Sequence, residues 1–394
     1  MVQWNDQVQM DRAVGYNLYQ ENPLSLSSPP NQGQPRPIES DRARQSIKIM
    51  AFDEFDPIDR EIMNTIQAAF PLVAEPYKAV AETVGTTEQD VIDRIGVLRQ
   101  KNVVRQIGAI FDTRKLKYQS MLVAMRFPEE KLDSAARFLN RHPGISHNYE
   151  RDGFFNLWFT IAVPPDHSLE GEIENLGRLT GALTTRLLPT IKFFKIGVNF
   201  DMVKGKSNAT EGYRPDDQGT TSTTSPDVTQ DIVDYVKVMQ EDLDPVSRPF
   251  DSMTEQLGMT VDQLFARAEE LTKQKIMRRY SAVLHHRRAG FSSNAMIVWK
   301  VPEERSEEIG ILMAEHPAVT HCYQRPTYED WPYSHFTMVH GTSAEECEQF
   351  GNEIAESTGM DERQLVYSLR EYKKTRVRYF VEDEFVVEKL QPIG

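Results

Sequence analysis

The sequence predicts an α+β fold in which a winged helix-turn-helix followed by a ferredoxin-like βαββαβ domain occurs twice in tandem. Three observations predict it. In each half, segments of helical periodicity are followed by alternating strands and helices. The string HPGISHNYER (142–151) returns 174 positions later as HPAVTHCYQR (316–325). A polar stretch rich in Gly, Pro, Ser and Thr, residues 205–226, separates the halves as a linker.

The first half begins with a polar tail, residues 1–50, which is expected to be disordered because it cannot bury enough apolar surface to offset its ordering entropy. Folded structure is expected from Phe52. Asp56-Pro57 supplies an N-cap with proline at the first helical position, and Gly85-Thr86 is the tight turn of a helix-turn-helix. The expected elements are helices at about 57–70, 77–84 and 87–100, a wing strand at 103–111, strands at 120–127, 156–163 and 184–200, a strand in the repeated string 142–151, and helices at 129–141 and 169–180.

The second half repeats this order, with helices expected around 230–241, 249–257 and 261–274. Residues 278–287 correspond to 105–114. Phe159-Thr160 corresponds to Phe336-Thr337, so about three extra residues are expected in the loop that carries Asp330-Trp331-Pro332-Tyr333. The predicted domains are a disordered tail (1–50), helix-turn-helix 1 (51–104), ferredoxin-like domain 1 (105–204), the linker (205–226), helix-turn-helix 2 (227–277) and ferredoxin-like domain 2 (278–394).

Composition excludes several classes of protein. The chain has 394 residues and a net charge of −14, which argues against non-specific binding of nucleic acid or of an anionic membrane. Cys322 and Cys347 have no metal-type spacing, so no metal site is predicted and a reducing cytoplasm is the expected compartment. No signal peptide and no membrane-spanning run are expected.

The repeated string carries the chemistry. Each copy contains His-x-Tyr-x-Arg, and alternation along a strand places the three side chains on one face. That face holds an imidazole, a phenol and a guanidinium where a strand that only packs on a core would present apolar residues. His147, Tyr149 and Arg151 and their counterparts His321, Tyr323 and Arg325 are therefore predicted to form two walls of one polar pocket.

A winged helix followed by a βαββαβ domain resembles the Lrp/AsnC family of transcription regulators. The strings RQIGAIFD (105–112), HNYER (147–151) and NLWFT (156–160) resemble one subunit type of siroheme decarboxylase. Four strings of the second half resemble the partner subunit type: RRYSAVLHHR (278–287), NAMIVW (294–299), HCYQR (321–325) and DWPY (330–333). The likeness covers about residues 52–390, and the chain looks like the two subunit types fused.

The resemblance implies removal of carbon dioxide from two ring acetates of siroheme, giving didecarboxysiroheme for haem or for a nitrite-reductase haem. The implied active site is a cavity between two ferredoxin-like units, so the chain is expected to be an intramolecular pseudo-dimer. The tetrapyrrole is the expected partner and no cofactor is required. A bound haem and a further homo-oligomer stay open. Gln106 departs from the second arginine of many relatives, and Cys322 replaces Asn148, so the halves are expected to be unequal.

A macrocycle ringed by carboxylates requires guanidiniums and an aromatic slot. The candidate substrate-binding residues are Arg105, Arg114, Tyr149, Arg151, Arg278, Arg279, His285, Arg287, Tyr323, Arg325 and Trp331. Trp158, Phe155 and Trp299 are further candidates for the slot. Loss of carbon dioxide leaves a carbon that must be protonated, and imidazole is suited to that step. His147 and His321 are the predicted catalytic residues.

Other histidines carry alternatives. His285 or His286 come second as proton donors, and these two with His321, Cys322 and His335 are alternative iron ligands, although no spacing forces that role. His142 and His316 are expected to be structural, and His167 and His340 are given no role.

Two other functions stay open. The winged helices fit an Lrp/AsnC-type DNA-binding regulator, but Glu88, Asp90 and Asp93 on the candidate recognition helix oppose a phosphate backbone. No nucleic-acid partner is therefore expected. A tetrapyrrole sensor without catalysis would share the pocket and differ only in turnover.

Overall fold

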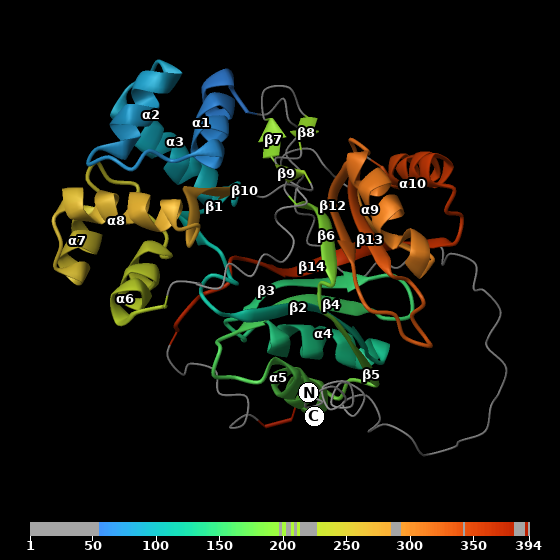
Figure 1. The fold of residues 1–394 in the computed structure, drawn as a ribbon. Helices are drawn as coiled ribbons and strands as arrows, with labels where there is room; N and C mark the ends of the chain where they lie inside the picture. Colours follow the sequence, from blue (N-terminus) through green and yellow to red (C-terminus); the bar gives the residue numbers. More distant parts are fainter. Residues whose placement is uncertain are drawn as a thin grey trace, which may run out of the picture. The chain divides into compact units, whose positions relative to one another are not determined.

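A computed structural model describes residues 55–196, 199–201, 206–208, 211–212, 227–284, 293–341, 343–381 and 391–392 (Figure 1). The tail expected to be disordered, 1–50, and most of the expected linker lie outside these residues. The architecture combines two helix-turn-helix units with two ferredoxin-like units, which confirms the α+β tandem fold.

The first helix-turn-helix consists of α1 (Pro57–Ala68), α2 (Pro76–Val84) and α3 (Glu88–Gln100). The Asp56 side chain accepts from the Asp59 N–H and caps α1, as predicted. Gly85 ends α2 with φ +82°, a left-handed conformation that glycine adopts without steric cost. The second unit consists of α6 (Gln230–Met239), α7 (Asp251–Leu257) and α8 (Val261–Lys273), and α8 begins with a capping box of Thr260 and Gln263.

The two predicted wing strands pair with each other. β1 (Val104–Phe111) and β10 (Met277–Leu284) form an antiparallel two-stranded sheet, with Ala109 opposite Tyr280. The two helix-turn-helix units also share one hydrophobic core, and the Tyr77 hydroxyl donates to the Asp244 carbonyl at 2.8 Å. The halves are therefore joined before the ferredoxin-like units begin.

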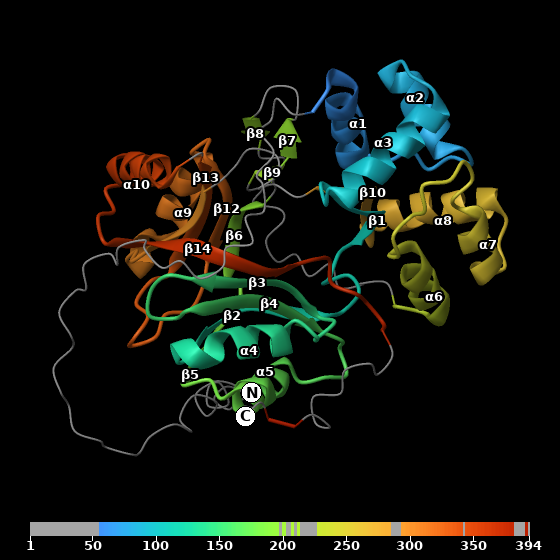
Figure 2. The same ribbon diagram turned by 180° about the vertical axis from the view of Figure 1, so that it is seen from behind.

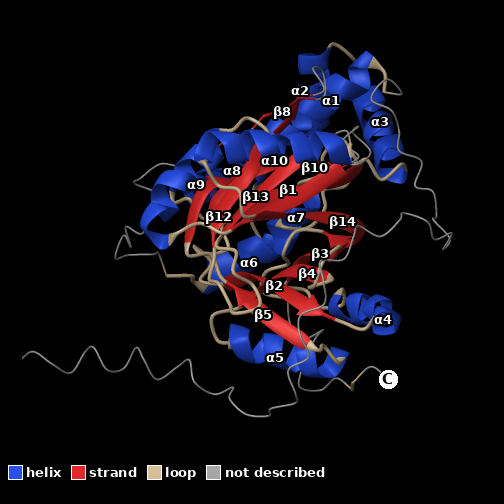
Figure 3. Ribbon diagram, turned by 90° about the vertical axis from the view of Figure 1, so that its right-hand side faces the viewer, coloured by secondary structure: helices blue, strands red, loops and turns tan. Residues whose placement is uncertain are grey.

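Each ferredoxin-like unit has the predicted βαββαβ order. The first contains β2 (Gln119–Arg126), α4 (Glu129–Leu139), β3 (Ile145–Arg151), β4 (Leu157–Val163), α5 (Leu169–Thr180) and β5 (Thr184–Leu188). The second contains β11 (Ser293–Trp299), α9 (Ser306–Glu315, after a 3₁₀ turn at Glu303–Arg305), β12 (Val319–Gln324), β13 (His335–Gly341), α10 (Ala344–Thr358) and β14 (Arg363–Lys374). Figure 3 shows α4 and α5 on the outer face of the first sheet. Helices α9 and α10 pack on the second sheet.

The last strand of each half crosses into the sheet of the other. In β14, residues 363–367 pair with β11 and residues 368–374 pair with β3. Figure 2 shows β14 between the strands of the two halves. In the first half, β5 pairs with β2, whereas β6 (Lys192–Ile196) pairs with β12. The sheet order is β5-β2-β4-β3-β14-β11-β13-β12-β6-β9, a ten-stranded sheet whose two outer regions are connected through the β5–β6 segment.

This exchange corrects the single strand expected at 184–200. The segment is divided into β5, β6 and β7 (Asn199–Asp201), because its first part completes one sheet and its middle part joins the other. β7 pairs with β8 (Lys206–Asn208), and β9 (Glu211–Gly212) pairs with β6. The short strands β8 and β9 lie in the stretch expected to be a linker.

The strand register also corrects the predicted repeat. His147 lies opposite Thr160 in β4, and His321 lies opposite Met338 in β13. Thr160 therefore corresponds to Met338, a displacement of 178, and the second β12–β13 loop carries four extra residues relative to the 174 of the histidine motif. The predicted match of Thr160 with Thr337 is wrong by one residue. The side chains of β13 that face inward are therefore Phe336, Met338 and His340, one position later than the predicted match implies.

Three cores hold the ferredoxin-like units together. One lies under the helices of the first half and one under the helices of the second. The third joins the halves through residues such as Trp158, Phe336 and Trp331. None of the helices in the described part of the chain is long and apolar enough to cross a membrane.

Candidate active site

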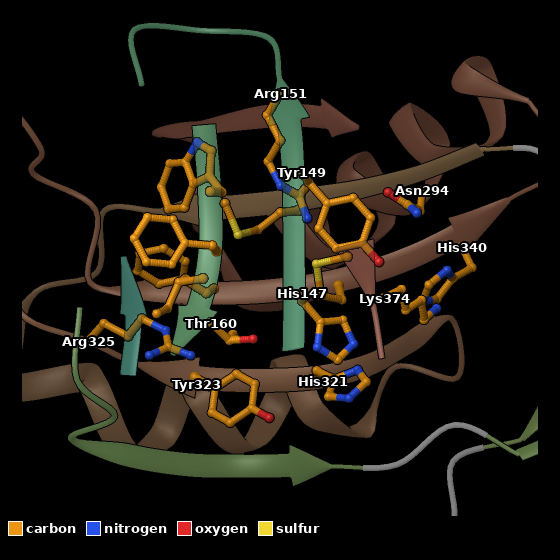
Figure 4. Close-up of a pocket in the computed structure, with 16 residues that line it drawn as sticks. His147, Tyr149, Arg151, Thr160, Asn294, His321, Tyr323, Arg325, His340 and Lys374 are labelled. Atoms are coloured by element: carbon orange, nitrogen blue, oxygen red, sulfur yellow. The ribbon is translucent and has the colours of Figure 1, made fainter. Parts of the chain in front are cut away.

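A cavity of about 450 Å³ lies between the strands of the first half and those of the second half of the ten-stranded sheet (Figure 4). It is lined by Leu122, His147, Tyr149, Arg151, Trp158, Phe159, Thr160, Asn294, Met296, His321, Tyr323, Arg325, Phe336, Met338, His340 and Lys374. The two His-Tyr-Arg faces meet there, which confirms the prediction of one pocket with two such walls. The chemical role of each residue stays a prediction.

A β-bulge aims each histidine. The register of β3 against β4 shifts between Ile145 and His147, and that of β12 shifts at the equivalent place before His321. A bulge rotates the backbone locally and re-aims the side chain beside it. As a result Ser146 Oγ lies 2.9 Å from Nδ1 of His147, and Thr320 Oγ1 lies 3.1 Å from Nδ1 of His321. With Nδ1 held in this way, Nε2 is the ring nitrogen left to meet a ligand.

Both imidazoles are neutral at pH 7 in the free protein. Burial and, after it, the positive charge of Lys374 lower the pKa of His147 to about 4. Burial and Lys374 likewise lower the pKa of His321 to about 4. Desolvation disfavours the charged form of a base. Negative charge brought in by a ligand would act in the opposite direction.

The motif arginines are anchored at the strand crossings. Arg151 Nη1 donates to the carbonyl of Val366 at 3.0 Å, and Arg325 Nη1 donates to the carbonyl of Leu188. They are 7% and 8% exposed. Each guanidinium lies over the tyrosine of its own motif, at 5.5 Å for Tyr149 and 4.9 Å for Tyr323. Burial lowers the pKa of Arg325 to about 10, so it stays charged at pH 7.

Four other predicted arginines, Arg105, Arg114, Arg278 and Arg279, do not line the cavity. Arg105 lies just outside it, paired with Glu371 at 2.6 Å, and Glu371 also accepts from the Tyr149 hydroxyl at 3.3 Å. Arg278 pairs with Asp112 at 2.8 Å. Arg114 is 68% exposed, and Arg279 is exposed. His285 and Arg287 lie outside the described residues, as does His286.

The aromatic slot is partly as predicted. Trp158 lines the cavity, whereas Trp331 and Phe155 pack behind it, with ring centroids 5.3 and 6.3 Å from that of Trp158. Trp331 therefore supports the wall and does not line it. Trp299 is wrong as a slot residue, because it is buried in the core under α9 and α10 and donates to Thr337 Oγ1 at 2.9 Å.

Sequence reasoning missed four polar residues of the cavity: Thr160, Asn294, His340 and Lys374. His340 was given no role, yet it shares the inward face of β13 with Phe336 and Met338. Burial lowers its pKa to about 3, with His321 and Lys374 acting in the same direction. The alternation along β13 could have found it. Lys374 belongs to the half of β14 that crosses to β3, so local periodicity gave no signal.

The expected structural histidines are confirmed as such. His142 Nε2 lies 3.0 Å from Glu172, and His316 Nε2 lies 3.1 Å from Glu353, both away from the cavity. His335 is buried at 2.9 Å from the Ser306 carbonyl, and Cys322 is in the core, so neither faces the cavity as an iron ligand would. Within the described ranges, no group of three or more His, Cys, Asp or Glu is placed to hold a metal ion.

Comparison with known families divides the chain in the same way. The AsnC-like ligand binding domain matches residues 118–195 and 288–373. The siroheme decarboxylase NirDL-like HTH domain matches residues 59–105 and 235–278. Both families match twice, once in each half, in agreement with the tandem fold.

Among curated proteins, siroheme decarboxylase of Hydrogenobacter thermophilus is 38% identical over 335 residues, which cover 84% of this chain and 96% of that protein. The chain belongs to the siroheme decarboxylase family. A crystal structure of siroheme decarboxylase NirDL has a TM-score of 0.62 at 33% identity and covers 82% of this chain and 95% of its own. A second, in complex with an iron-uroporphyrin III analogue, has a TM-score of 0.61 at 32% identity, with the same coverage of both chains.

Family members with separate subunits match one half each. The siroheme decarboxylase beta subunit of Methanosarcina barkeri is 43% identical over 146 residues, covering 37% of this chain and 96% of that subunit. The alpha subunit of Desulfovibrio desulfuricans is 35% identical over 152 residues, covering 39% of this chain and 87% of that subunit. The chain is thus a fused form of the two subunit types.

Proposed function

We propose that this chain is a siroheme decarboxylase, a carboxy-lyase that removes carbon dioxide from two ring acetates of siroheme and releases didecarboxysiroheme. The observation that carries the proposal is the single cavity in which two His-Tyr-Arg faces meet. The substrate class agrees with the iron-uroporphyrin analogue held by the related NirDL structure. The product would supply haem synthesis or the haem of a nitrite reductase, in the cytoplasm, where the free thiols of Cys322 and Cys347 stay reduced.

The cavity offers both kinds of contact that the substrate requires. Arg151, Arg325 and Lys374 supply positive charge for ring carboxylates. Trp158, Met296, Phe336 and Met338 supply apolar surface for the flat ring. Arg105 lies outside the wall and orients Tyr149 through Glu371. No further cofactor is required, because the macrocycle itself accepts the electron pair.

The reaction needs an unsolvated carboxylate and a proton. When the carbon–carbon bond breaks, carbon dioxide leaves and the electron pair of that bond stays on the exocyclic carbon. From there it is delocalised into the macrocycle. Protonation of that carbon gives the methyl group, and imidazole is the proposed donor. The bound carboxylates bring negative charge next to His147 and His321, which raises the pKa of both imidazoles.

Product mass tests this proposal. Purified protein incubated with siroheme without oxygen should release a product lighter by two carbon dioxide units. Siroheme that binds but keeps its mass would contradict the enzyme and support a tetrapyrrole sensor. The variant Arg325→Met removes one guanidinium from the wall. It should weaken siroheme binding and so show that the product forms in this cavity.

The DNA-binding alternative is disfavoured by the contacts of α3. Its one central cation, Arg94, lies within 2.8 Å of Asp56, Asp59 and Asp90, so its charge is neutralised within the domain. Glu88, in the first turn of α3, accepts from Ser247 of the other helix-turn-helix at 2.8 Å. A helix start engaged in this way is not free to enter a groove. Sequence-specific gel shifts at low salt would revive the regulator.

A further inference from the structure

The two motif histidines of the cavity, His147 and His321, have equivalent positions but different hydrogen-bond partners. In both motifs a hydroxyl group precedes the histidine and lies within hydrogen-bond distance of Nδ1. A hydroxyl has one proton to donate, and a neutral imidazole has one N–H and one lone pair. The direction of each hydroxyl–imidazole bond therefore decides which nitrogen carries the proton.

In the second half, the proton of Thr320 is already engaged. Thr320 Oγ1 donates to the carbonyl of Met338 at 3.2 Å. The 3.1 Å contact between Thr320 and His321 then requires that His321 Nδ1 be the donor. A neutral His321 with its proton on Nδ1 has a lone pair on Nε2. Thr320 is 2% exposed and lines neither of the two described cavities.

In the first half, either hydroxyl of the chain can be the donor, so the chain is able to run in the other direction. Ser146 Oγ lies 2.9 Å from His147 Nδ1 and 2.9 Å from Thr160 Oγ1. Thr160 can donate to Ser146, and Ser146 can then donate to Nδ1. This leaves the proton of His147 on Nε2, the nitrogen that meets the ligand. The difference arises because Met338 stands at the position of Thr160 and provides only its carbonyl.

A second cavity, of about 620 Å³, lies against the other side of His147. Its lining includes Ser146 and His147 together with residues 375–379, which follow β14. Glu241 and Arg378, which also line it, are 54% and 52% exposed, so this cavity reaches the surface.

Its cations are already paired. Arg376 donates to the carbonyls of Gly108 and Ala109 at 2.8 and 3.1 Å, and Arg378 pairs with Glu241 at 2.8 Å. Lys373 donates to two backbone carbonyls. Because this cavity reaches the surface and its cations are engaged, it is suited to water and not to an anionic ligand.

We infer that His147 and His321 hold opposite tautomers and divide the work: His147 is the proton donor, resupplied through Ser146 from the second cavity, whereas His321 presents a lone pair and accepts. This inference rests on the proposed decarboxylation. In a decarboxylation step the Nε2 proton of His147 passes to the exocyclic carbon, Nδ1 takes the Ser146 hydroxyl proton, and Ser146 takes one from water in the second cavity, which is left as hydroxide. The ring then holds its proton on Nδ1, so before the second step Nδ1 returns that proton to Ser146 and Nε2 takes a proton from water that enters the first cavity. Each lost carbon dioxide thus consumes one proton from solvent, while the substrate remains in the first cavity.

Nitrogen NMR of the free protein tests the tautomers without any turnover. In protein labelled with ¹⁵N-histidine at pH 7, His147 should show its proton on Nε2 and His321 on Nδ1, each resonance assigned with the corresponding His→Gln variant. The same tautomer at both positions, or the reverse assignment, would overturn the inference. This readout leaves the proposed function untouched, since it needs no substrate.

Matched variants test the division of work. Glutamine keeps a polar group at the Nε2 position but cannot transfer a proton, so His147→Gln should lower kcat at least a hundredfold and His321→Gln less than tenfold. Ser146→Ala should lower kcat at least tenfold with KM changed less than threefold, and Ser146→Thr, which copies Thr320, should restore most of it. Equal losses for the two glutamine variants would overturn the inference. If no variant and no parent protein turns siroheme over, the function fails and the tautomer result still stands.

Discussion

At the scale of single residues, Lys374 breaks the symmetry of the cavity. The register places Lys373 opposite Asn148 and Lys374 opposite His147, and in the other half it places Lys195 opposite Cys322. Lys373 and Lys195 are equivalent in contact as well, since each donates to the carbonyl of the structural histidine, His142 or His316. Lys374 therefore corresponds to Ile196 in sequence, and its ammonium adds charge at only one of two equivalent places.

Replacing this lysine should raise the pKa of the cavity histidines. The charge of Lys374 lowers the pKa of His147, His321 and His340, so Lys374→Met removes a repulsion against each imidazolium. His321 should respond clearly, because after burial Lys374 is its main perturbing charge. An NMR titration of the imidazole protons measures the change, with the exposed Lys300→Met as control. Unchanged values in Lys374→Met would show that the ammonium does not act on these rings.

At the scale of elements, the bulges and the exchanged strands place the site. The bulge before each histidine brings its hydroxyl neighbour to Nδ1, and the crossing of β6 and β14 brings both motifs to one cavity. Arg151 and Arg325 then hold β14 and β5 at the crossings through backbone carbonyls. The site and the joint between the halves are thus built from the same residues.

One close contact makes the exchange testable. Gly310 lies in α9, and a Cβ there would be 2.2 Å from the ring of Phe194, which is in β6 and fully buried. Gly310→Ala should therefore destabilise the protein by about 1–3 kcal/mol through overpacking. Urea unfolding measures the loss. The double variant Gly310→Ala with Phe194→Leu should recover part of it, and an additive double variant would mean that the two residues do not meet.

The same contact shows where sequence reasoning stopped. The tandem fold and the paired His-Tyr-Arg walls could be predicted, because periodicity and an internal repeat are local signals. The pairing of Phe194 with a helix of the other half could not, since nothing in its own segment distinguishes a crossing strand from a straight one. His340 was missed for a related reason: the repeat was matched one residue out of register after the β12–β13 loop. Arg278 pairs with Asp112, which becomes adjacent to it only in the fold, and Arg114 is exposed, so neither lines the cavity.

At the scale of the whole molecule, the two halves behave as two subunits in one chain. They share the core of the helix-turn-helix units, the β1–β10 sheet and both strand crossings. The related alpha and beta subunits carry the same units on separate chains. Covalent connection is therefore not what holds the halves together.

Cutting the chain between residues 212 and 227 should leave a complex. Co-expressed pieces 1–220 and 221–394 should co-purify in equal amounts and keep siroheme turnover within about threefold of the intact chain. Each piece expressed alone should aggregate or fail to unfold cooperatively, because β3 and β12 would lose a neighbouring strand. Size-exclusion chromatography and thermal unfolding check both outcomes. A folded, monomeric single half would contradict the exchanged architecture.

Acid should destabilise the whole fold well before its carboxylates titrate. His147, His321 and His335 have a pKa lowered to about 4 and His340 to about 3, all chiefly by burial. In the unfolded chain these groups have a pKa near 6.5. Their contribution is fully present above that value and is lost as the pH falls from about 6.5 toward 4, because the unfolded state then binds more protons.

The free energy of unfolding should therefore fall by at least about 2 kcal/mol between pH 7 and pH 5, given about 1.4 kcal/mol per pH unit for each proton. Asp56, Asp90 and Asp133 have a lowered pKa and stay ionised over this range. Burial raises the pKa of Asp152 and Asp242, so the folded state binds protons there first and offsets a part of the histidine effect at its acid end. Urea unfolding at each pH measures the slope. His340→Ala, which copies Ala162 of the first half, should reduce the slope of the unfolding free energy against pH by up to one proton. An unfolding free energy that does not change with pH in either protein would mean that these imidazoles are hydrated in the free cavity.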